Sequence, residues 1–242
     1  LVTQFKTHIK NMKDVEDFIH LLLKTRFVFD NYVVKTDHLN DATEDNSNWS
    51  LLKPYFVNSK LSPRNTFQDD RTQDIVVKIE SMFQVTDPRQ IYKSYLYGLL
   101  RILHTWMDHK DEKQLINHLI DFSKERFRAI TVEENVYDKG VGTPNYIFNF
   151  LDFVLWYQEV IEKEKIGVIA VEFEFKDRNS VEHFYTQNHS KSENLARVDE
   201  KDLNNFGKLC IMPRQNNSLR SNIMPSAKIK ECRSSSQGLT VE

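Results

Sequence analysis

The spacing of hydrophobic residues predicts helices over most of the first two thirds of the chain. Between residues 12 and 35, apolar side chains recur every three or four positions, which is the period of an amphipathic helix. These side chains are Val15, Phe18, Ile19, Leu22, Leu23, Phe27 and Val28. The same period predicts helices at about 73–85, 88–108, 112–128 and 145–165, with Pro88 in a first helical turn. We therefore expect a helical domain over residues 1–166, whose apolar stripes pack a core.

Two polar stretches interrupt this helical pattern. Residues 36–50 are rich in Asp and Asn and poor in aromatic side chains. Residues 58–70, "NSKLSPRNTFQDD", are similarly polar. Both compositions are typical of loops.

After Gly167 the period changes from helical to alternating. In "VIAVEFEF", residues 168–175, every second side chain is a large apolar one, which predicts a half-buried strand. "KDRNS" then predicts a turn, and "VEHFYTQ", residues 181–187, predicts a second strand with Val181, His183 and Tyr185 on one face. A polar loop to about Leu203, a short strand "KLCIM" and a helix or loop "NNSLRSN" complete the expected module of residues 167–231. Residues 232–242 have the composition of a disordered tail.

Composition narrows the class of protein. The 242 residues are 40% hydrophobic, which is enough for a core, and the net charge of -2 excludes a globally basic nucleic-acid binder but not a local basic patch. Cys210 and Cys232 form no C-x-x-C pair, so a disulfide framework or a cysteine-rich zinc site is not expected. No apolar run approaches the roughly 20 residues that span a bilayer, so we expect a cytoplasmic protein without a membrane partner. Because the sequence starts at Leu1 within a helical pattern, we expect it to be part of a longer protein.

Residues suited to phosphodiester hydrolysis occur in the C-terminal third. That reaction needs a base to activate water and a divalent cation to neutralise charge on the phosphate. Mg²⁺ takes one or two protein oxygens together with water and phosphate. Glu182, His183 and Asn217 supply a carboxylate, an imidazole and an amide oxygen. Since neighbours on a strand point to opposite faces, Glu182 and His183 can converge only where the strand twists, bulges or ends.

Two segments, "VEHFYTQN" and "LNNFGKLCIMPRQNNSLRSNIMPSAK", carry a family resemblance. They resemble the C-terminal HNH nuclease domain (ββα-metal, His-Me finger) of GmrSD-type restriction enzymes. That family's pattern runs Glu-His-Ile-x-Pro-Gln, then Asn-x-x-Gly-Asn-Leu, then Asn-Ser-x-x-x-Asn and a late Lys. The segments are more distantly similar to the HNH domain of RNA-guided CRISPR nucleases. The resemblance covers about residues 168–231.

The resemblance implies a role for each matching residue. His183 stands at the position of the general base, Glu182 at the position of the acidic metal ligand, and Asn217 at that of the Asn that completes a Mg²⁺ or Mn²⁺ site. Asn204 would be structural, or would cap the loop that holds the base, and Lys228 would contact phosphate. The remaining matches of the supporting set are Gln187 and Asn222.

The chain also departs from the family pattern. Phe184 replaces Ile, Thr186 replaces Pro, and Lys208 replaces the Asn of Gly-Asn-Leu. The first two changes alter the exit from the strand and therefore the aim of His183, but they remove no catalytic group. Within the "NNS" run, Asn216 could take the place of Asn217, because such runs commonly form turns or helix caps.

Local charge supports phosphate binding independently of the resemblance. Between residues 203 and 233 the only anion is Glu231, against six cations: Lys208, Arg214, Arg220, Lys228, Lys230 and Arg233. A cationic patch on a slightly acidic protein is what binding to a nucleic-acid backbone requires.

Together these patterns predict a mainly α fold with a small α+β C-terminal module, in which a helical domain precedes a ββα-metal, HNH-like nuclease fold. The expected function is metal-dependent cleavage of double-stranded DNA, either modified or unmodified, as the effector of a bacterial modification-dependent restriction or phage-defence protein. The family's ParB-like nucleotide-hydrolysing domain, marked by Asp-Gly-Gln-Gln-Arg, has no match here, nor is there a Gly-rich phosphate loop, so we expect that domain to be missing. An inactive HNH-fold module that binds nucleic acid or protein, and an RNase toxin, are the alternatives.

Overall fold

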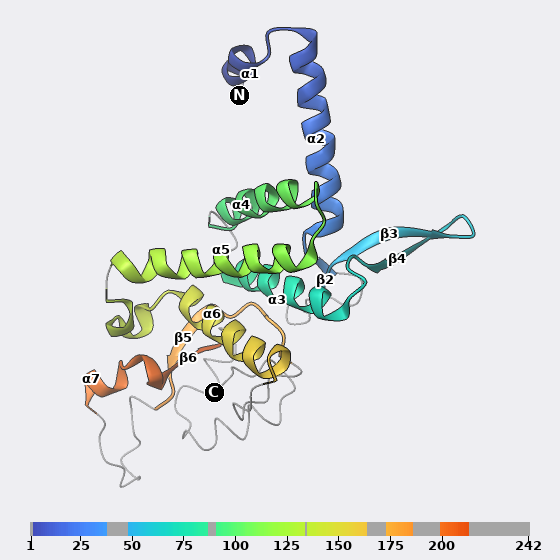
Figure 1. The fold of residues 1–242 in the computed structure, drawn as a ribbon. Coiled ribbons are helices and arrows are strands. Elements are labelled where there is room, and N and C mark those ends of the chain that lie inside the picture. Colours follow the sequence, from blue (N-terminus) through green and yellow to red (C-terminus); the bar gives the residue numbers. More distant parts are fainter. Residues whose placement is uncertain are drawn as a thin grey trace.

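The computed structural model describes residues 2–37, 48–86, 91–133, 135–163, 173–185 and 199–212, and the account below concerns these residues. Over them the chain is mainly helical, with small antiparallel sheets of two strands each (Figure 1). This confirms the mainly α class with minor β structure. The boundary expected at residue 166 lies in 164–172, outside the described residues.

Among the described residues, five longer helices carry the body of the molecule: α2 (Met12–Tyr32), α3 (Asp70–Thr86), α4 (Ile91–Trp106), α5 (Glu112–Glu133) and α6 (Asn145–Trp156). The short helix α1 (Val2–His8) lies at the outer end of α2, away from the body (Figure 1). Helix α3 packs against α4, α5 and α6, and α2 crosses α4 at one end of this stack (Figure 1). Their buried faces form one core that includes Val28, Ile79, Leu99, Leu115 and Phe153. The helical period therefore predicted the main elements correctly, although α6 ends at Trp156 and continues as a π-helical turn, η3 (Tyr157–Ile161).

The prediction that the whole apolar stripe of α2 packs a core is wrong for the first half of the helix. Helix α2 begins outside the body, with a capping box between Asn11 and Asp14, and runs toward it (Figure 1). Only its last turns reach the core, where Val28 is fully buried, whereas Leu22 and Leu23 are exposed. Amphipathic spacing indicates a helix face but does not show whether another element covers it.

Both stretches predicted as loops contain strands. Strands β1 (Lys35–Asp37) and β2 (Asn48–Ser50) pair antiparallel at the two ends of the first stretch, whose residues 38–47 lie outside the described part. Strands β3 (Leu52–Val57) and β4 (Lys60–Asn65) form a hairpin that includes most of the second stretch. Because β4 is exposed along its length, it has no buried apolar face for an alternating pattern to reveal.

The strand predicted at 168–175 is not formed in its described part, residues 173–175. The alternation itself is real, because Phe173 and Phe175 are buried and the residue between them is exposed. Side chains take the place of a partner strand: the Lys78 ammonium donates to the Phe173 carbonyl, and the Trp49 indole N–H donates to the Phe175 carbonyl. Alternation therefore indicated extended backbone and burial, but not membership of a sheet.

The C-terminal hairpin pairs β5 (Ser180–His183) with β6 (Leu209–Met212), so the partner of the "VEH" strand is "LCIM" rather than "VIAVEFEF". The connection between them includes a short helix, α7 (Glu200–Leu203), where a polar loop was expected, and a 3-10 turn, η4 (Phe206–Lys208). The hairpin packs on α6 and on the 3-10 turn η2 (Gly140–Gly142), which follows η1 (Val136–Asp138). Within the described part, this hairpin contains the candidate site.

Candidate functional site

His183 ends strand β5, and its backbone is held along one edge by the start of β6. It lies opposite Leu209 in the β5–β6 register, and the next N–H, that of Phe184, donates to the Lys208 carbonyl at 2.8 Å. The side chain of His183 is 8% exposed, and its Nε2 lies 2.9 Å from Oδ1 of Asn204. The structure thus brings together two residues that are 21 positions apart and that both belong to the predicted set.

Asn204 is fixed just after α7 by a close approach to Gly140. A Cβ on Gly140 would lie 2.6 Å from Asn204 Oδ1, and the φ of Gly140 is +55°, a backbone conformation that disfavours other residues. The following residue, Asn205, caps η4 by accepting from the Gly207 N–H at 3.1 Å. The turn that carries Asn204 is therefore held by the helical body on one side and by its own cap on the other.

The Asn204 contact determines which nitrogen of His183 can act as a base. An amide oxygen only accepts hydrogen bonds, so in the neutral imidazole Nε2 carries the proton and donates it to Asn204 Oδ1. The basic lone pair then resides on Nδ1. This arrangement gives Asn204 a more specific position than the resemblance implied, since it orients the imidazole directly.

Glu182 lies next to His183 on β5, opposite Cys210 in the register. Side chains alternate along a strand, so Glu182 shares a face with Ser180 and points away from the face of His183. Consistent with this, the Ser180 hydroxyl lies 3.3 Å from Glu182 Oε1 and donates to it. The two groups predicted to serve one site therefore leave the backbone in opposite directions at this point of the chain.

The chain that enters β5 is anchored in the body by a buried ion pair. Arg178 Nη2 lies 2.7 Å from Asp152 Oδ2 and 2.7 Å from Asn149 Oδ1, both on α6. Arg178 is only 2% exposed, and its guanidinium faces the rings of Phe173 and Phe175 at 5.5 and 5.9 Å. These contacts position the hairpin on α6.

The turn predicted at residues 176–180 did not include this network. A signal for it does exist in α6, "NYIFNFLDFVLW", where Asn149 and Asp152 interrupt an otherwise apolar helix. Residues three apart lie on the same helix face, so two polar groups on a buried face predict a shared polar partner. Nothing in the sequence identifies Arg178 as that partner.

A second buried ionisable group lies in the body. Glu80 on α3 is fully buried, and its Oε2 accepts from the Val34 N–H at 2.7 Å. Burial raises the pKa of Glu80 to about 8, against the lowering effects of the Val34 hydrogen bond and of Lys35. The pKa values of Tyr92 and Tyr95 are also raised, first by burial and then by the negative charge of Glu80. Glu80 is remote in sequence from the hairpin and is not part of the predicted set.

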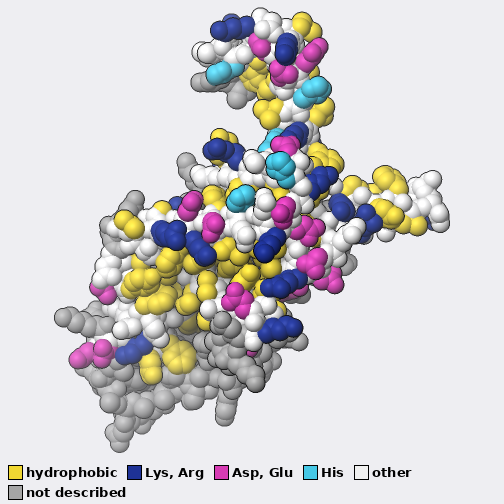
Figure 2. Space-filling model, viewed as in Figure 1, with side chains coloured by type: hydrophobic (Ala, Val, Ile, Leu, Met, Phe, Trp, Pro, Cys, Tyr) yellow, Lys and Arg dark blue, Asp and Glu magenta, His cyan; other side chains and the backbone are white. Residues whose placement is uncertain are grey.

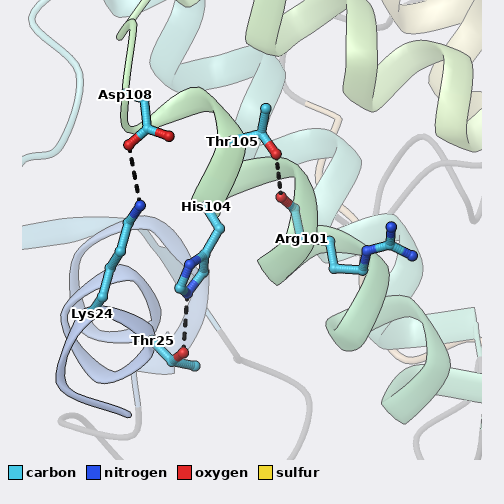
Figure 3. Close-up of polar contacts among 6 residues, drawn as sticks. All are labelled: Lys24, Thr25, Arg101, His104, Thr105 and Asp108. Carbon is cyan, nitrogen blue, oxygen red and sulfur yellow. Dashed lines mark hydrogen bonds and ion pairs between the residues drawn. The ribbon is translucent and has the colours of Figure 1, made fainter. Parts of the chain in front are cut away.

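The junction between α2 and α4 holds another histidine in a similar contact (Figure 3). His104 Nε2 lies 3.0 Å from Thr25 Oγ1, and Lys24 Nζ lies 3.2 Å from Asp108 Oδ1. The Thr25 hydroxyl donates its proton to the Leu21 carbonyl, so it accepts from His104. Partial burial and the neighbouring Lys24 lower the pKa of His104.

Four of the predicted site residues lie outside the described part of the chain: Gln187, Asn217, Asn222 and Lys228. The alternative ligand Asn216 and all the predicted cationic patch except Lys208 also lie there. Among the described residues, no group of three or more His, Cys, Asp or Glu side chains is placed to hold a metal ion. Of the two predicted metal ligands, Glu182 lies in the described part of the chain and Asn217 does not.

Comparison with known proteins gives no relative: no family model matches the chain, and neither a curated protein nor a solved structure matches it significantly. Within the described ranges, no helix combines the length and the apolar character needed to cross a membrane.

Proposed function

We propose that the chain is a metal-dependent DNA endonuclease of the HNH type, the effector part of a restriction or phage-defence protein. One observation carries the proposal. The two motif segments form an antiparallel pair of strands, and the hairpin presents a histidine oriented by an asparagine of the second segment. A ββα-metal nuclease requires such a pair of strands ahead of its metal-binding helix.

The residues have distinct tasks in this mechanism. His183 takes the proton of the attacking water at Nδ1, while Nε2 stays protonated and bonded to Asn204. Burial of the imidazole and the fixed turn at Gly140 hold it in one orientation, which limits the rotational freedom lost when the substrate binds.

The donor chemistry suits Mg²⁺ or Mn²⁺, because Glu182 supplies a carboxylate oxygen and Asn217 an amide oxygen. Glu182 and Asn217 would hold the cation, which would supply neutralisation of the charge on the scissile phosphate. Glu182 leaves β5 on the face opposite His183, so the proposal requires the phosphate to lie at the end of the strand, where both side chains can reach it.

The test is nicking of a supercoiled plasmid in Mg²⁺ or Mn²⁺ and in EDTA. His183→Ala should lower the rate by about 10² to 10⁴, the usual effect of losing a positioned base. His104→Ala is the matched control, because His104 is also bonded through Nε2 to a neutral side chain but lies on the other side of the body. Cleavage by His183→Ala at the normal rate would contradict the proposal. Offering RNA alongside DNA identifies an RNase.

A second candidate is an HNH-fold module that binds nucleic acid without cutting it. The opposite orientations of Glu182 and His183 on β5 favour it. In that case DNA binding persists, while no divalent metal gives cleavage above the EDTA control.

A further inference from the structure

The hairpin β3–β4 projects from the body as an arm (residues 52–65; Figure 1). Its strands are joined by the two-residue turn Asn58–Ser59, whose φ values of 49° and 62° are those of the tight turns that suit twisted hairpins. Each strand has six residues, so the arm extends about 20 Å from its root at about 3.3 Å per residue. Figure 2 shows hydrophobic side chains along the arm and basic ones nearer the body.

The root of the arm is fixed to α2 and α3. The Thr66 N–H donates to the Leu51 carbonyl at 3.2 Å, and Gln73 Nε2 donates to the same carbonyl at 2.7 Å. The Thr66 hydroxyl donates to the Asn31 carbonyl at 2.7 Å. Leu51, Thr66 and Gln73 are all buried, so the arm leaves the body in a defined direction.

The register gives the arm two faces of different chemistry. Directly opposed residues share a face, and alternate residues along each strand follow the same rule. One face is basic and consists of Lys53, Tyr55, Val57, Lys60, Ser62 and Arg64. The other face is almost entirely apolar and consists of Leu52, Pro54, Phe56, Leu61, Pro63 and Asn65.

The apolar face is strongly exposed. Phe56 is 67% and Leu61 is 63% accessible, and they lie opposite each other near the end of the arm. An isolated two-stranded hairpin is marginally stable in water. An exposed apolar pair at its end therefore indicates contact with a partner.

The partner is not another strand. Pro54 and Pro63 oppose each other in the middle of the hairpin and offer no N–H, and proline in edge strands blocks edge-to-edge pairing. A partner must therefore contact the faces of the arm rather than extend its sheet.

The charge of the arm indicates that its partner is a polyanion. The arm carries Lys53, Lys60 and Arg64 and no Asp or Glu, although the whole chain has a net charge of -2. The Arg64 guanidinium lies 3.8 Å from the centroid of the Tyr55 ring, which holds it flat along the basic face. Lys53 instead bonds to the Thr66 carbonyl at the root, so Lys60 and Arg64 are the cations placed for an external contact.

We propose that the arm grips duplex DNA. Its apolar end, Phe56 and Leu61, enters the minor groove and presses between base steps, and Lys60 and Arg64 reach the flanking phosphates. Apolar wedges of Phe, Leu and Pro are a known way of kinking DNA from the minor groove. The choice of DNA over an anionic lipid surface rests on the proposed function. The description of the two faces of the arm does not depend on that function.

The basic face is tested by anisotropy of a labelled 30-base-pair duplex with the full chain in EDTA, so that no cleavage is involved. Lys60→Gln/Arg64→Gln should weaken binding roughly tenfold or more at 0.1 M salt, because two contacts that each contribute about 0.9 to the salt slope are lost. Lys93→Gln/Arg128→Gln, exposed residues of α4 and α5 with the same change in charge, should leave the affinity within about twofold.

The apolar face is tested with Phe56→Ser/Leu61→Ser. This variant should keep the salt slope of the wild type but lose the shortening of the end-to-end distance, measured by energy transfer between dyes on the two duplex ends. Circular dichroism of each variant verifies that the helical body is unchanged.

Two results would overturn the inference. One is wild-type DNA affinity and bending in both arm variants. The other is that vesicles containing phosphatidylserine sediment the wild type but not the arm variants, with DNA binding equal in all three. If plasmid nicking fails while binding still depends on the arm, the nuclease proposal falls and the arm inference stands.

Discussion

The C-terminal hairpin and the α2–α4 junction use the same two kinds of contact in different surroundings. Each has a histidine whose Nε2 meets a neutral side-chain oxygen, at 2.9 Å for His183 and 3.0 Å for His104. Each also has an ion pair: Arg178 with Asp152 beside the hairpin, and Lys24 with Asp108 at the junction (Figure 3). The hairpin contacts are buried, whereas the ion pair at the junction is open to solvent.

Burial, rather than bond length, determines how much such contacts contribute to the free energy of unfolding. An exposed ion pair gains little because water and salt screen it. A buried pair has lost its water, so each charge depends on its partner. The hairpin can therefore hold one imidazole orientation through fixed contacts, whereas the junction can exchange its contacts for water at little cost.

The largest effect is expected from breaking the buried ion pair. Asp152→Ala leaves Arg178 buried without its carboxylate and should lower the free energy of unfolding by about 3–5 kcal/mol. Asp108→Ala, the matched change at the junction, should cost less than about 1 kcal/mol. Urea unfolding followed by circular dichroism measures both. Similar losses in the two variants would show that burial does not separate the regions.

Removing the acceptor of each histidine should give a smaller difference in unfolding free energy between the two regions. Asn204→Ala leaves the buried Nε2–H of His183 without its acceptor and should cost about 1–3 kcal/mol in unfolding free energy. Thr25→Val removes the acceptor of His104 in the more open region and should stay within about 0.5 kcal/mol. Under the proposed function, Asn204→Ala should also slow plasmid nicking, while Thr25→Val should not. A larger loss of stability in Thr25→Val than in Asn204→Ala would contradict the distinction between the two histidines.

The smallest effect concerns pH at the junction. The folded-state pKa of His104 is lowered, so below its ordinary value of 6.5 the unfolded chain binds more protons than the native one. Stability should therefore fall as the pH drops from 6.5 through the lowered folded pKa, because partial burial and then the charge of Lys24 disfavour the protonated ring, which Asp108 offsets in part. His104→Gln should reduce this acid-side loss and change stability at pH 8 by less than about 0.5 kcal/mol. Unfolding midpoints of both proteins from pH 8 to pH 5 give the measurement, and parallel curves would exclude His104 as the source.

The helices were predictable because their burial follows a local period. The arm was not, since both of its faces are exposed and its strands lack the pattern of one buried and one polar face. Alternation at Phe173 and Phe175 correctly indicated burial, but the partners of their carbonyl groups are side chains from α3 and β2. Period alone cannot distinguish such donors from a neighbouring strand.

The candidate site was predictable only in part, for a related reason. The resemblance singled out His183 and Asn204, and the structure places them in contact. It gave no indication of Arg178 and Asp152, because their contact joins segments 26 residues apart through tertiary packing. The assignments of Gln187, Asn217, Asn222 and Lys228 remain predictions.

The buried carboxyl of Glu80 couples folding to proton uptake from the solvent. Its folded pKa of about 8 exceeds the ordinary 4.5, so between these values the native chain holds a proton that the unfolded chain has released. The free energy of unfolding is therefore not reduced by Glu80 at acid pH, and it falls as the pH rises through this interval. Near pH 7, above the range in which His104 releases protons on folding, Glu80 should take up most of one proton per folding event. The calorimetric enthalpy should therefore vary with the ionisation enthalpy of the buffer, and this dependence should decrease in Glu80→Gln.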